Sequence, residues 1–259
     1  MYKFITYQIE NNVARVTLSR PEVYNAVNNG LTYELQDVFK EIASNDEVRV
    51  VVLTGEGKAF CSGQDLKSHM GDEKDSFTNV LEKRYNPLIR QMRELAKPII
   101  ARVNGVAAGA GCSLALACDI IVADENAVFT EVFINIGLVL DSGSSYFLPR
   151  LVGSTKAFEL ATMASKIKGK EAFELGIVNK AVPTDQLDEA VKYYTDYYAK
   201  APTLAIGLMK KMQNRSGYSS LDEMLELEKE YQQIAGTSYD YEEGVNAFLE
   251  KRKPEFKGK

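Results

Sequence analysis

The stretch that decides the fold is PIIARVNGVAAGAGCSLALACDIIVADE, residues 98–125. The run 98–105 is largely apolar, as expected for a strand that is covered on both faces of a parallel sheet. The small residues of 106–118 lead into a short helix, and 119–125 is a second apolar, β-branched run. Strand, helix and strand in this order predict an α/β unit with a right-handed crossover.

Two β-rich runs lie near the N-terminus, FITYQIE (4–10) and VARVTLS (13–19). Asn11 and Asn12 separate them, and because asparagine tolerates the left-handed backbone of a tight turn, we predict a hairpin. The run VRVVVLTG (48–55) is apolar almost without alternation and predicts a further strand that is covered on both faces.

Apolar residues recur every three to four positions in many other segments, which is typical of a helix with one buried face. We expect helices over 31–43, 77–95, 155–164, 170–175, 186–200, 203–214, 220–235 and 240–251. Pro87 is expected to bend the second of these, because proline cannot donate to the helical ladder. Ser220 with Glu223 matches the capping box and predicts a helix start. Asp240 with Glu243 matches it as well and predicts the start of the last helix.

The composition excludes several classes of protein. With 259 residues, 45% of them hydrophobic and 26% charged, the chain is neither disordered nor fibrous. Its 31 Lys and Arg against 36 Asp and Glu leave a net charge of -5, so nucleic acid is not an expected partner. The N-terminus lacks the apolar region of a signal peptide, and Arg102 and several glycines interrupt the most apolar stretch, so no membrane segment is expected.

The cysteines and the single histidine restrict the chemistry. Cys61, Cys112 and Cys118 have no partner at metal-ligand spacing, so we interpret them as core residues of a cytoplasmic protein without a metal site. His69 lies in a polar stretch, where we expect it to be solvated. A Ser-His-Asp triad would have to use this residue. Carboxylates, amides or backbone groups are therefore the expected reactive groups.

Two glycine-rich segments superficially resemble nucleotide-binding loops. GEGKAFCSG (55–63) lacks the spacing and the Ser or Thr of a P-loop, and GAGCSL (109–114) lacks the third glycine of a dinucleotide-binding turn. Both segments offer backbone that a ligand can approach closely. Two backbone amides that converged from them would stabilise an oxyanion.

Motifs in order along nearly the whole chain resemble the crotonase, or enoyl-CoA hydratase/isomerase, superfamily. They are RPEVYNAV (20–27), AFCSGQDLK (59–67), NGVAAGAGCSLALACDIIVA (104–123), GLVLDSGSSYFLPRLVG (137–153), GKEAFELGIVNKAVP (169–183) and FLEKRKPEF (248–256). The resemblance implies an α/β fold with a spiral core of ββα turns over residues 1–197. It also implies a helical region over 198–259 that mediates trimer contacts, commonly within a dimer of trimers.

The resemblance further implies an acyl-CoA thioester substrate, with coenzyme A entering as part of it and no separate cofactor. The two oxyanion-hole amides of the family fall on Gln64 and Ala110. The CoA moiety is expected along Val23, Ala59, Ser62, Gln64, Leu66 and Lys67. The acyl group is expected beside Ser113, Phe133 and Leu138. In this family a neighbouring subunit can complete the CoA pocket, which makes Phe248 and Lys251 further candidates.

Hydratases of this family activate water with two glutamates, and the resemblance places Ser113 and Phe133 at those positions. Glu131 would share a face with Phe133 in a strand, although two residues displace a carboxylate by about 7 Å. Asp141 stands where certain isomerases of the family carry their acid/base. The pattern looks like that of the phenylacetate-pathway isomerases and the Asp-type enoyl-CoA isomerases. Because one carboxylate suffices for a 1,3-proton shift, we expect an enoyl-CoA isomerase in which Asp141 is catalytic.

Other roles remain alternatives. Asp141 also suits the N-cap of a helix that begins near Ser144. A 2-enoyl-CoA hydratase is the next candidate activity. Aryl-CoA dehalogenases of the family place a nucleophilic Asp at this position but rely on a tryptophan, which this chain lacks. An RNA-binding relative would need a lysine-rich helix, whereas residues 31–43 hold one Lys beside three acidic residues. A catalytically silent relative is the last alternative.

Overall fold

The computed structural model describes residues 2–72 and 74–259. Its main sheet has the strand order β1-β2-β3-β5-β7-β10, and a smaller sheet has the order β4-β6-β8-β9. The strands of the main sheet are β1 Ile5–Glu10, β2 Val13–Leu18, β3 Val50–Gly55, β5 Ile99–Val103, β7 Ile120–Asp124 and β10 Lys180–Val182. Those of the smaller sheet are β4 Ala59–Cys61, β6 Val106–Ala108, β8 Val128–Thr130 and β9 Ile167–Lys168. Successive strand pairs separated by helices confirm the predicted α/β fold of ββα turns.

The strand predictions for the main sheet are confirmed. β1 and β2 form an antiparallel hairpin whose turn residues, Asn11 and Asn12, have positive φ angles of 51° and 64°. β2, β3, β5 and β7 pair in parallel. Every residue of β3 is buried, as expected for a strand covered on both faces.

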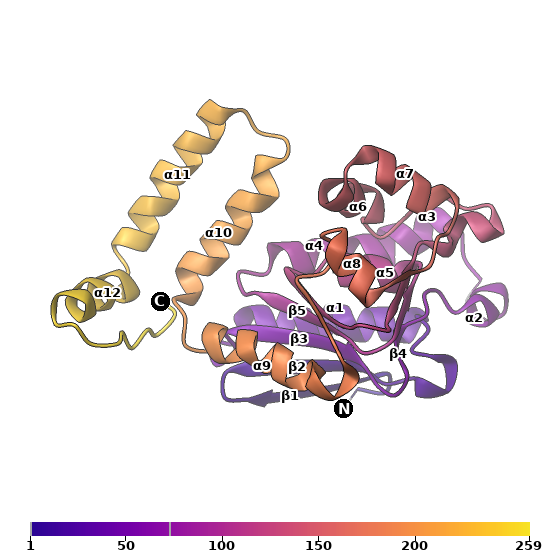
Figure 1. Cartoon of the computed structure of the whole chain (residues 1–259), viewed down its shortest axis with the longest axis horizontal. Helices are drawn as coiled ribbons and strands as arrows, with labels where there is room; N and C mark the ends of the chain where they lie inside the picture. The colour runs from indigo at the N-terminus through magenta and orange to yellow at the C-terminus, as the bar shows by residue number, and fades with distance from the viewer. Residues whose placement is uncertain (1, 73) are drawn as a thin grey trace.

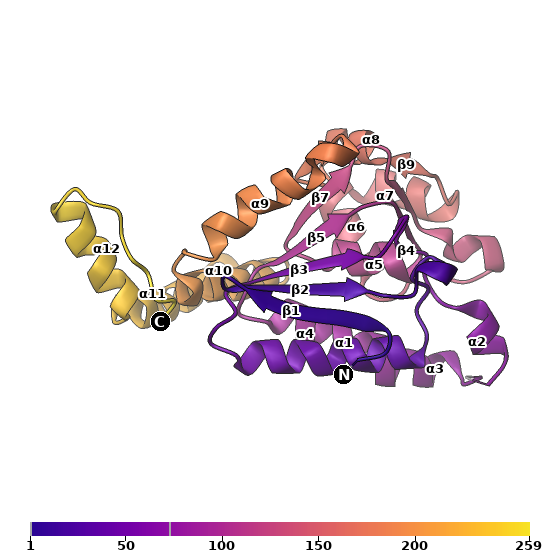
Figure 2. The same ribbon diagram turned by 90° about the horizontal axis from the view of Figure 1, so that it is seen from below.

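Helices cover both faces of the main sheet (Figure 2). They are α1 Asn29–Ser44, α2 Leu66–Met70, α3 Phe77–Val80, α4 Asn86–Glu94, α5 Ala110–Leu116, α6 Ser144–Val152, α7 Ser154–Thr162, α8 Gly169–Glu174, α9 Leu187–Tyr198, α10 Thr203–Ser216, α11 Leu221–Gly236 and α12 Tyr239–Leu249. α1 and α4 lie on one face, and α9 packs Leu187 and Val191 against Val52 and Val122 on the other. Among these helices, none has the length and apolarity needed to cross a bilayer.

The helix expected over 77–95 runs from Phe77 to Glu94 without leaving the helical conformation, but its middle turn is irregular. A π-helical turn, Leu81–Tyr85, separates α3 from α4. Pro87 follows this turn closely and has no N–H to donate to the helical ladder, and the Lys83 carbonyl accepts a hydrogen bond from Gln36 Nε2 at 3.1 Å instead. Such π-helical turns frequently occur at functional sites.

Three C-terminal helices, α10 to α12, project from the body as an arm (Figure 1). Lys210 of α10 anchors the arm: its Nζ donates to the carbonyl oxygens of Met92 and Lys97 at 2.8 and 3.2 Å and pairs with Asp119 at 2.7 Å. α11 buries none of its residues. The arm therefore exposes apolar surface in the single chain.

One of the two predicted capping boxes is confirmed. Ser220 and Glu223 satisfy each other's backbone N–H groups at the start of α11. The box predicted for Asp240 is wrong, because Ser238 caps α12 instead. The Asp240 carboxylate accepts hydrogen bonds from the backbone amides of Lys257 and Gly258 at 2.6 and 2.8 Å, so it ties the C-terminal tail to the arm.

Candidate active site

A cavity of about 130 Å³ lies where the segment after β4, the start of α5 and the loop before α6 meet. We call it the main cavity. It is lined by Ser62, Gly63, Gln64, Leu66, His69, Phe77, Val80, Leu81, Tyr85, Gly109, Ala110, Val132, Phe133, Ile136, Leu138 and Asp141. Asp141 is its only acidic side chain among the residues that the structure describes. The wall is otherwise mostly apolar, which strengthens any electrostatic interaction inside it.

The main cavity brings together the two residues predicted to supply oxyanion-hole amides. Gln64 follows β4, and Ala110 is the first residue of α5. A Cβ atom added to Gly63 would lie 3.6 Å from the Ala110 nitrogen and 2.7 Å from the Ala108 oxygen, so the two segments approach as closely as a glycine allows. Within residues 2–72 and 74–259, the amides of Gln64 and Ala110 donate to no other group. Both are therefore available to a ligand.

Side-chain contacts hold the Gln64 segment in place. The Tyr85 hydroxyl donates to Gln64 Oε1 at 2.6 Å, and Arg84 donates to the same oxygen at 3.3 Å. On the other side, Arg20 forms an ion pair with Asp65 at 2.9 Å. These contacts orient the Gln64 amide before any substrate binds, which is the requirement for electrostatic stabilisation of a transition state.

Asp141 lies on a strained turn before α6. Ser142 and Gly143 follow it with φ angles of 50° and 85°, and Ser142 donates to Asp141 Oδ1 at 2.7 Å. Burial raises the pKa of the Asp141 carboxyl, and the hydrogen bond from Ser142 opposes this rise. The N-cap of α6 is Gly143, and the Asp141 side chain does not cap the helix. The capping alternative is therefore wrong, and the carboxyl is left for another role.

Of the three residues predicted to lie beside the acyl group, two line the main cavity and one is buried behind its wall. Phe133 and Leu138 line the main cavity. Ser113 is fully buried behind the wall, and its hydroxyl donates to the carbonyl oxygens of Gly109 and Asp141, each at 3.2 Å. Ser113 thus contacts the backbone of the Asp141 turn and does not line the cavity.

Glu131 lies outside the main cavity. It was expected to share a strand face with Phe133, but the strand ends at Thr130 and Phe133 lies in a 3-10 turn, Val132–Ile136. That turn directs the two side chains to different cavities. Glu131 lines a much smaller one of about 10 Å³ with Cys112, is 3% exposed, and has no hydrogen bond to either carboxylate oxygen among the described residues. Burial raises its pKa to about 8, and the nearby Cys112 thiol opposes this rise.

His69 is not solvated, contrary to the prediction. It is 7% exposed, lines the main cavity and packs against Phe77 with ring centroids 5.2 Å apart. The sequence around His69 is polar, but Phe77 of α3 packs against the imidazole and helps to bury it. Sequence reasoning therefore missed His69, and it missed Tyr85 as well, because neither belongs to a motif.

Some of the residues predicted to contact CoA line the main cavity, and others lie outside it. Ser62 and Leu66 belong to the cavity wall, and Lys67 is exposed at the start of α2. Ser62 donates to the Val23 carbonyl at 3.2 Å, which joins two of these residues. Ala59 is 1% exposed within β4.

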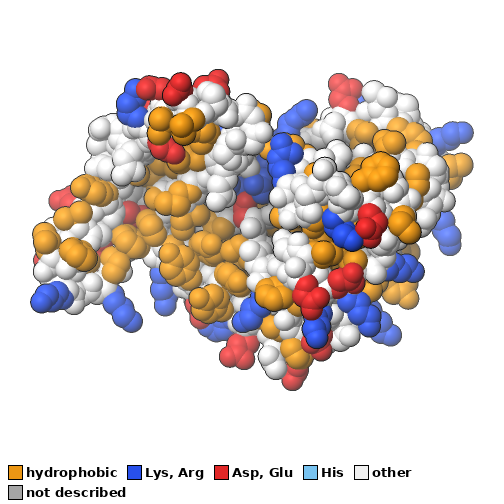
Figure 3. Space-filling view, turned by 45° about the horizontal axis from the view of Figure 1, so that its top comes forward, with side chains coloured by type: hydrophobic (Ala, Val, Ile, Leu, Met, Phe, Trp, Pro, Cys, Tyr) orange, Lys and Arg blue, Asp and Glu red, His pale blue; other side chains and the backbone are white. Residues whose placement is uncertain are grey.

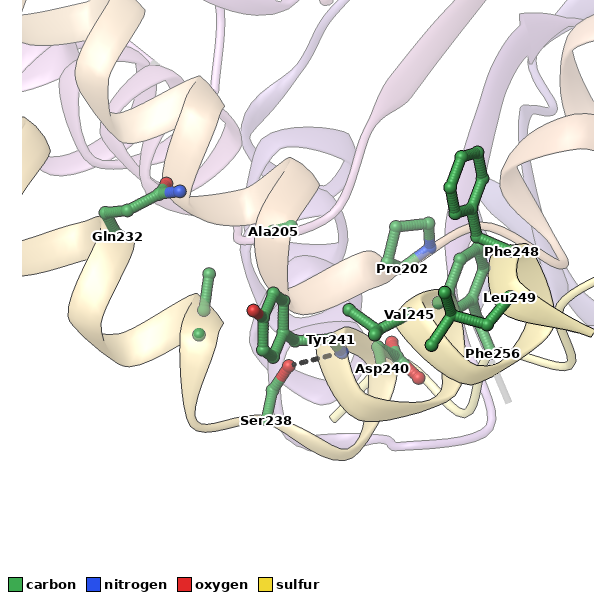
Figure 4. Close-up of a pocket in the computed structure, with 13 residues that line it drawn as sticks. Pro202, Ala205, Gln232, Ser238, Asp240, Tyr241, Val245, Phe248, Leu249 and Phe256 are labelled. Carbon is green, nitrogen blue, oxygen red and sulfur yellow. Dashed lines mark hydrogen bonds between the residues drawn. The ribbon is translucent and has the colours of Figure 1, made fainter.

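Phe248 and Lys251 belong to the arm. Phe248 is 83% exposed and lines a groove of about 390 Å³ between α10, α11 and α12, together with Val245, Leu249 and Phe256 (Figure 4). Hydrophobic side chains gather over this part of the molecule (Figure 3). Phe248 and Lys251 do not line the main cavity of their own chain.

The comparisons with known proteins agree with one another. The family model described as enoyl-CoA hydratase/isomerase matches residues 8–259. The chain is 39% identical over 262 residues to 1,2-epoxyphenylacetyl-CoA isomerase of Escherichia coli (strain K12), with 100% of each chain covered. It is 40% identical over 258 residues to a probable enoyl-CoA hydratase of Rhodobacter capsulatus, covering 100% of this chain and 99% of the other. The crystal structure of an enoyl-CoA hydratase from Bacillus anthracis is similar with a TM-score of 0.94 at 31% identity, covering 99% and 100%.

Proposed function

We propose that this chain, which belongs to the enoyl-CoA hydratase/isomerase family, shifts a double bond in an enoyl-CoA thioester. The observation that carries the proposal is that Asp141 is the one acidic side chain among the described residues of a cavity to which Gln64 and Ala110 also belong, and that the amides of these two residues donate to no described group. One base and two N–H donors are what a 1,3-proton shift needs. The E. coli relative is named an isomerase, which supports this type of reaction.

In the proposed reaction, the Asp141 carboxylate takes a proton from C2 of a 3-enoyl-CoA. The electron pair of the broken C–H bond delocalises over the thioester carbonyl, and the resulting oxyanion accepts hydrogen bonds from the Gln64 and Ala110 amides. Asp141 then returns the proton to C4, and the double bond moves to C2–C3. Each amide donor of this kind contributes roughly 10²–10³ in rate. The reaction needs no metal or redox cofactor.

Hydration of a 2-enoyl-CoA is the second candidate, because the R. capsulatus and B. anthracis relatives are named hydratases. Against it, the family resemblance places Ser113 and Phe133 at the two positions where hydratases have glutamate. Glu131 lies in a separate cavity and cannot orient water beside the amides without a rearrangement of the 3-10 turn.

We also propose that the active form is a homotrimer or a dimer of trimers in which the arm packs against a neighbouring copy. Leu221, Leu225, Phe248 and Leu249 of the arm are between 50% and 83% exposed in the single chain. Contiguous apolar surface of this kind marks an interaction site. In such an assembly Phe248 and Lys251 approach the CoA moiety of the neighbour.

The test follows conjugated enoyl-thioester absorbance with a 3-enoyl-CoA and a 2-enoyl-CoA of equal chain length. We expect a rise with the 3-enoyl substrate and no loss with the 2-enoyl substrate. Asp141→Asn removes the base and keeps the shape, so turnover is expected to fall by about 10²–10⁴. Asp196→Asn, an exposed change on α9, is the control and is expected to retain full activity.

The outcomes separate the candidates. Loss of absorbance with the 2-enoyl substrate would indicate hydration. Undiminished isomerisation by Asp141→Asn would remove Asp141 from the mechanism. Absence of turnover with both substrates, together with absence of CoA-thioester binding, would contradict the proposed function as a whole.

A further inference from the structure

We propose that Arg84 is a positioning residue: its buried positive charge, held against the Gln64 side chain, stabilises the oxyanion that forms beside the Gln64 amide. The inference rests on the proposed function, since it takes that amide as part of the oxyanion hole. Arg84 belongs to the π-helical turn between α3 and α4 and is 2% exposed. No carboxylate of the described residues forms an ion pair with it.

The hydrogen bonds of the Arg84 guanidinium go to neutral groups. Its Nε donates to the Thr32 hydroxyl at 3.0 Å, and one terminal nitrogen, Nη2, donates to Gln64 Oε1 at 3.3 Å. The other terminal nitrogen, Nη1, is buried and has no hydrogen-bond partner in the part of the chain that the structure describes. The centroid of the Tyr85 ring lies 5.3 Å from the guanidinium carbon. The charge is therefore buried without a compensating negative charge among these residues.

A buried charge without an ionic partner disfavours folding, because the ion loses its hydration and gains no ion pair in return. Removal of Arg84 would leave neither of its neighbours unpaired. The Thr32 hydroxyl also donates to the Asn29 carbonyl at 2.8 Å, and Gln64 Oε1 also accepts from the Tyr85 hydroxyl at 2.6 Å. Arg84 is thus not needed to satisfy either group, and its unfavourable burial calls for a functional explanation.

Contacts on both sides hold the charge close to the Gln64 amide. Gln36 of α1 donates its side-chain amide to the carbonyl oxygens of Lys83 and Arg84 at 3.1 and 2.9 Å, which fixes the π-helical turn. The Gln64 side chain also donates through Nε2 to the Asp65 carbonyl at 3.3 Å. One glutamine side chain therefore connects the guanidinium to the backbone amide that is proposed to bind the oxyanion.

The charge favours the enolate over the substrate, because negative charge develops on the thioester oxygen only as the C2 proton leaves. Arg84 does not line the main cavity, so it acts through Gln64 and through its electric field. Solvent screens a buried charge much less than an exposed one. Across about the length of a glutamine side chain, at an effective dielectric constant of about 20, one unit charge changes the ionisation of a bound acid by roughly one pH unit.

The test uses acetoacetyl-CoA, a β-keto thioester that loses a proton from C2 to give an enolate with a distinct ultraviolet absorbance band. A pH titration of the bound ligand gives the midpoint of enolate formation in the unaltered protein, Arg84→Met, Arg84→Lys and Arg90→Met. Methionine removes the charge, whereas lysine keeps it and changes the geometry of the donors. Arg90→Met removes an exposed positive charge from α4 and is the matched control.

We expect Arg84→Met to raise this midpoint by about one pH unit, and Arg84→Lys and Arg90→Met to leave it nearly unchanged. Arg84→Met should also lower kcat for a 3-enoyl-CoA by about tenfold and change KM little, because Arg84 does not line the main cavity. If Arg84→Met does not fold, Arg84→Gln, which is neutral and polar, has to show the same shift.

Three results overturn the inference alone: an unchanged midpoint in the neutral variant, an equal shift in Arg90→Met, or a shift in Arg84→Lys as large as that in Arg84→Met. The last result would assign the effect to hydrogen-bond geometry instead of charge. An Arg84-dependent midpoint without turnover of any 3-enoyl-CoA would overturn the proposed function alone. Failure of acetoacetyl-CoA to bind would contradict both proposals.

Discussion

The hydroxyl of Ser113 donates a hydrogen bond across 3.2 Å to the main-chain oxygen of Asp141. The amide and hydroxyl of Ser144 reach the same oxygen, each at 3.0 Å. Helices α5 and α6 therefore hold the Asp141 turn from its backbone side, while its carboxyl lines the main cavity. Ser113 therefore helps to fix the turn that presents the Asp141 carboxyl to the main cavity.

Ser113→Ala is expected to lower kcat for a 3-enoyl-CoA by up to about tenfold, because one hydrogen bond that fixes the Asp141 turn is lost. KM should change little, since Ser113 does not line the cavity. Ser113→Cys keeps a weaker donor of similar size and should give an intermediate kcat. Steady-state kinetics checks this prediction, and a rise in KM at constant kcat would assign Ser113 to binding.

The activity is expected to rise with pH as the Asp141 carboxyl loses its proton. The base must be deprotonated, and burial raises the pKa of Asp141 above its usual value of 3.8. The acid limb of kcat/KM should therefore have its midpoint above that value. In Glu131→Met the limb should stay in place, which would show that it does not belong to the other buried carboxyl. A midpoint at the ordinary value would argue against a buried base.

Glu131 is expected to destabilise the protein as the pH rises. The folded protein keeps this carboxyl protonated up to its raised pKa of about 8, whereas in the unfolded chain the carboxyl loses its proton near the ordinary glutamate pKa of 4.5. Between these values the unfolded state binds fewer protons, so the free energy of unfolding falls as the pH increases. At pH 7 the cost is about 3 kcal/mol.

Glu131→Met should remove this cost. Denaturant unfolding is expected to show little difference from the unaltered protein at pH 5 and a stabilisation of about 3 kcal/mol at pH 7, since methionine fills a similar volume without a titrating group. Glu131→Gln should show the same weaker pH dependence at lower stability, because it retains buried polar atoms. Parallel pH profiles of the unaltered protein and both variants would contradict the raised pKa.

Leu225→Glu is expected to shift the protein toward the monomer. Leu225 is 50% exposed on α11 and lines the groove between α10 and α11, so a charge there would be buried in the proposed assembly. Glu226→Gln on the same helix removes only an exposed ion pair and serves as the control. Analytical ultracentrifugation measures the change, and an unaltered sedimentation profile for Leu225→Glu would place the interface elsewhere.

The sequence predicted the parts of the fold that depend on local pattern. The apolar runs 48–55 and 98–105 were predicted as strands because a strand that is buried on both faces is apolar along nearly its whole length, and both runs contain strands. Asp141 and the Gln64 and Ala110 amides were predicted from motifs, and the structure brings them to one cavity. A motif was sufficient there because it specifies the turn as well as the residue.

Other features depend on contacts between distant segments and were not predictable in this way. His69 lies in a polar stretch, yet α3 buries it. Glu131 and Phe133 would share one face of a strand, but Phe133 lies in a 3-10 turn and the two side chains line different cavities. Asp240 matches a capping box, but the returning tail offers its carboxylate two amides, and Ser238 takes the cap.

The strands of the main sheet follow one another in space in the order in which they occur along the chain, from β1 to β10. A ribosome releases the N-terminal part first, so each new strand finds its neighbour already made. The wall of the main cavity comes from residues 62–141, whereas the arm begins at Thr203. During synthesis the residues that form the main cavity therefore leave the ribosome before the arm does. Growing chains cannot associate through an arm that has not yet been made, so the cavity can fold first.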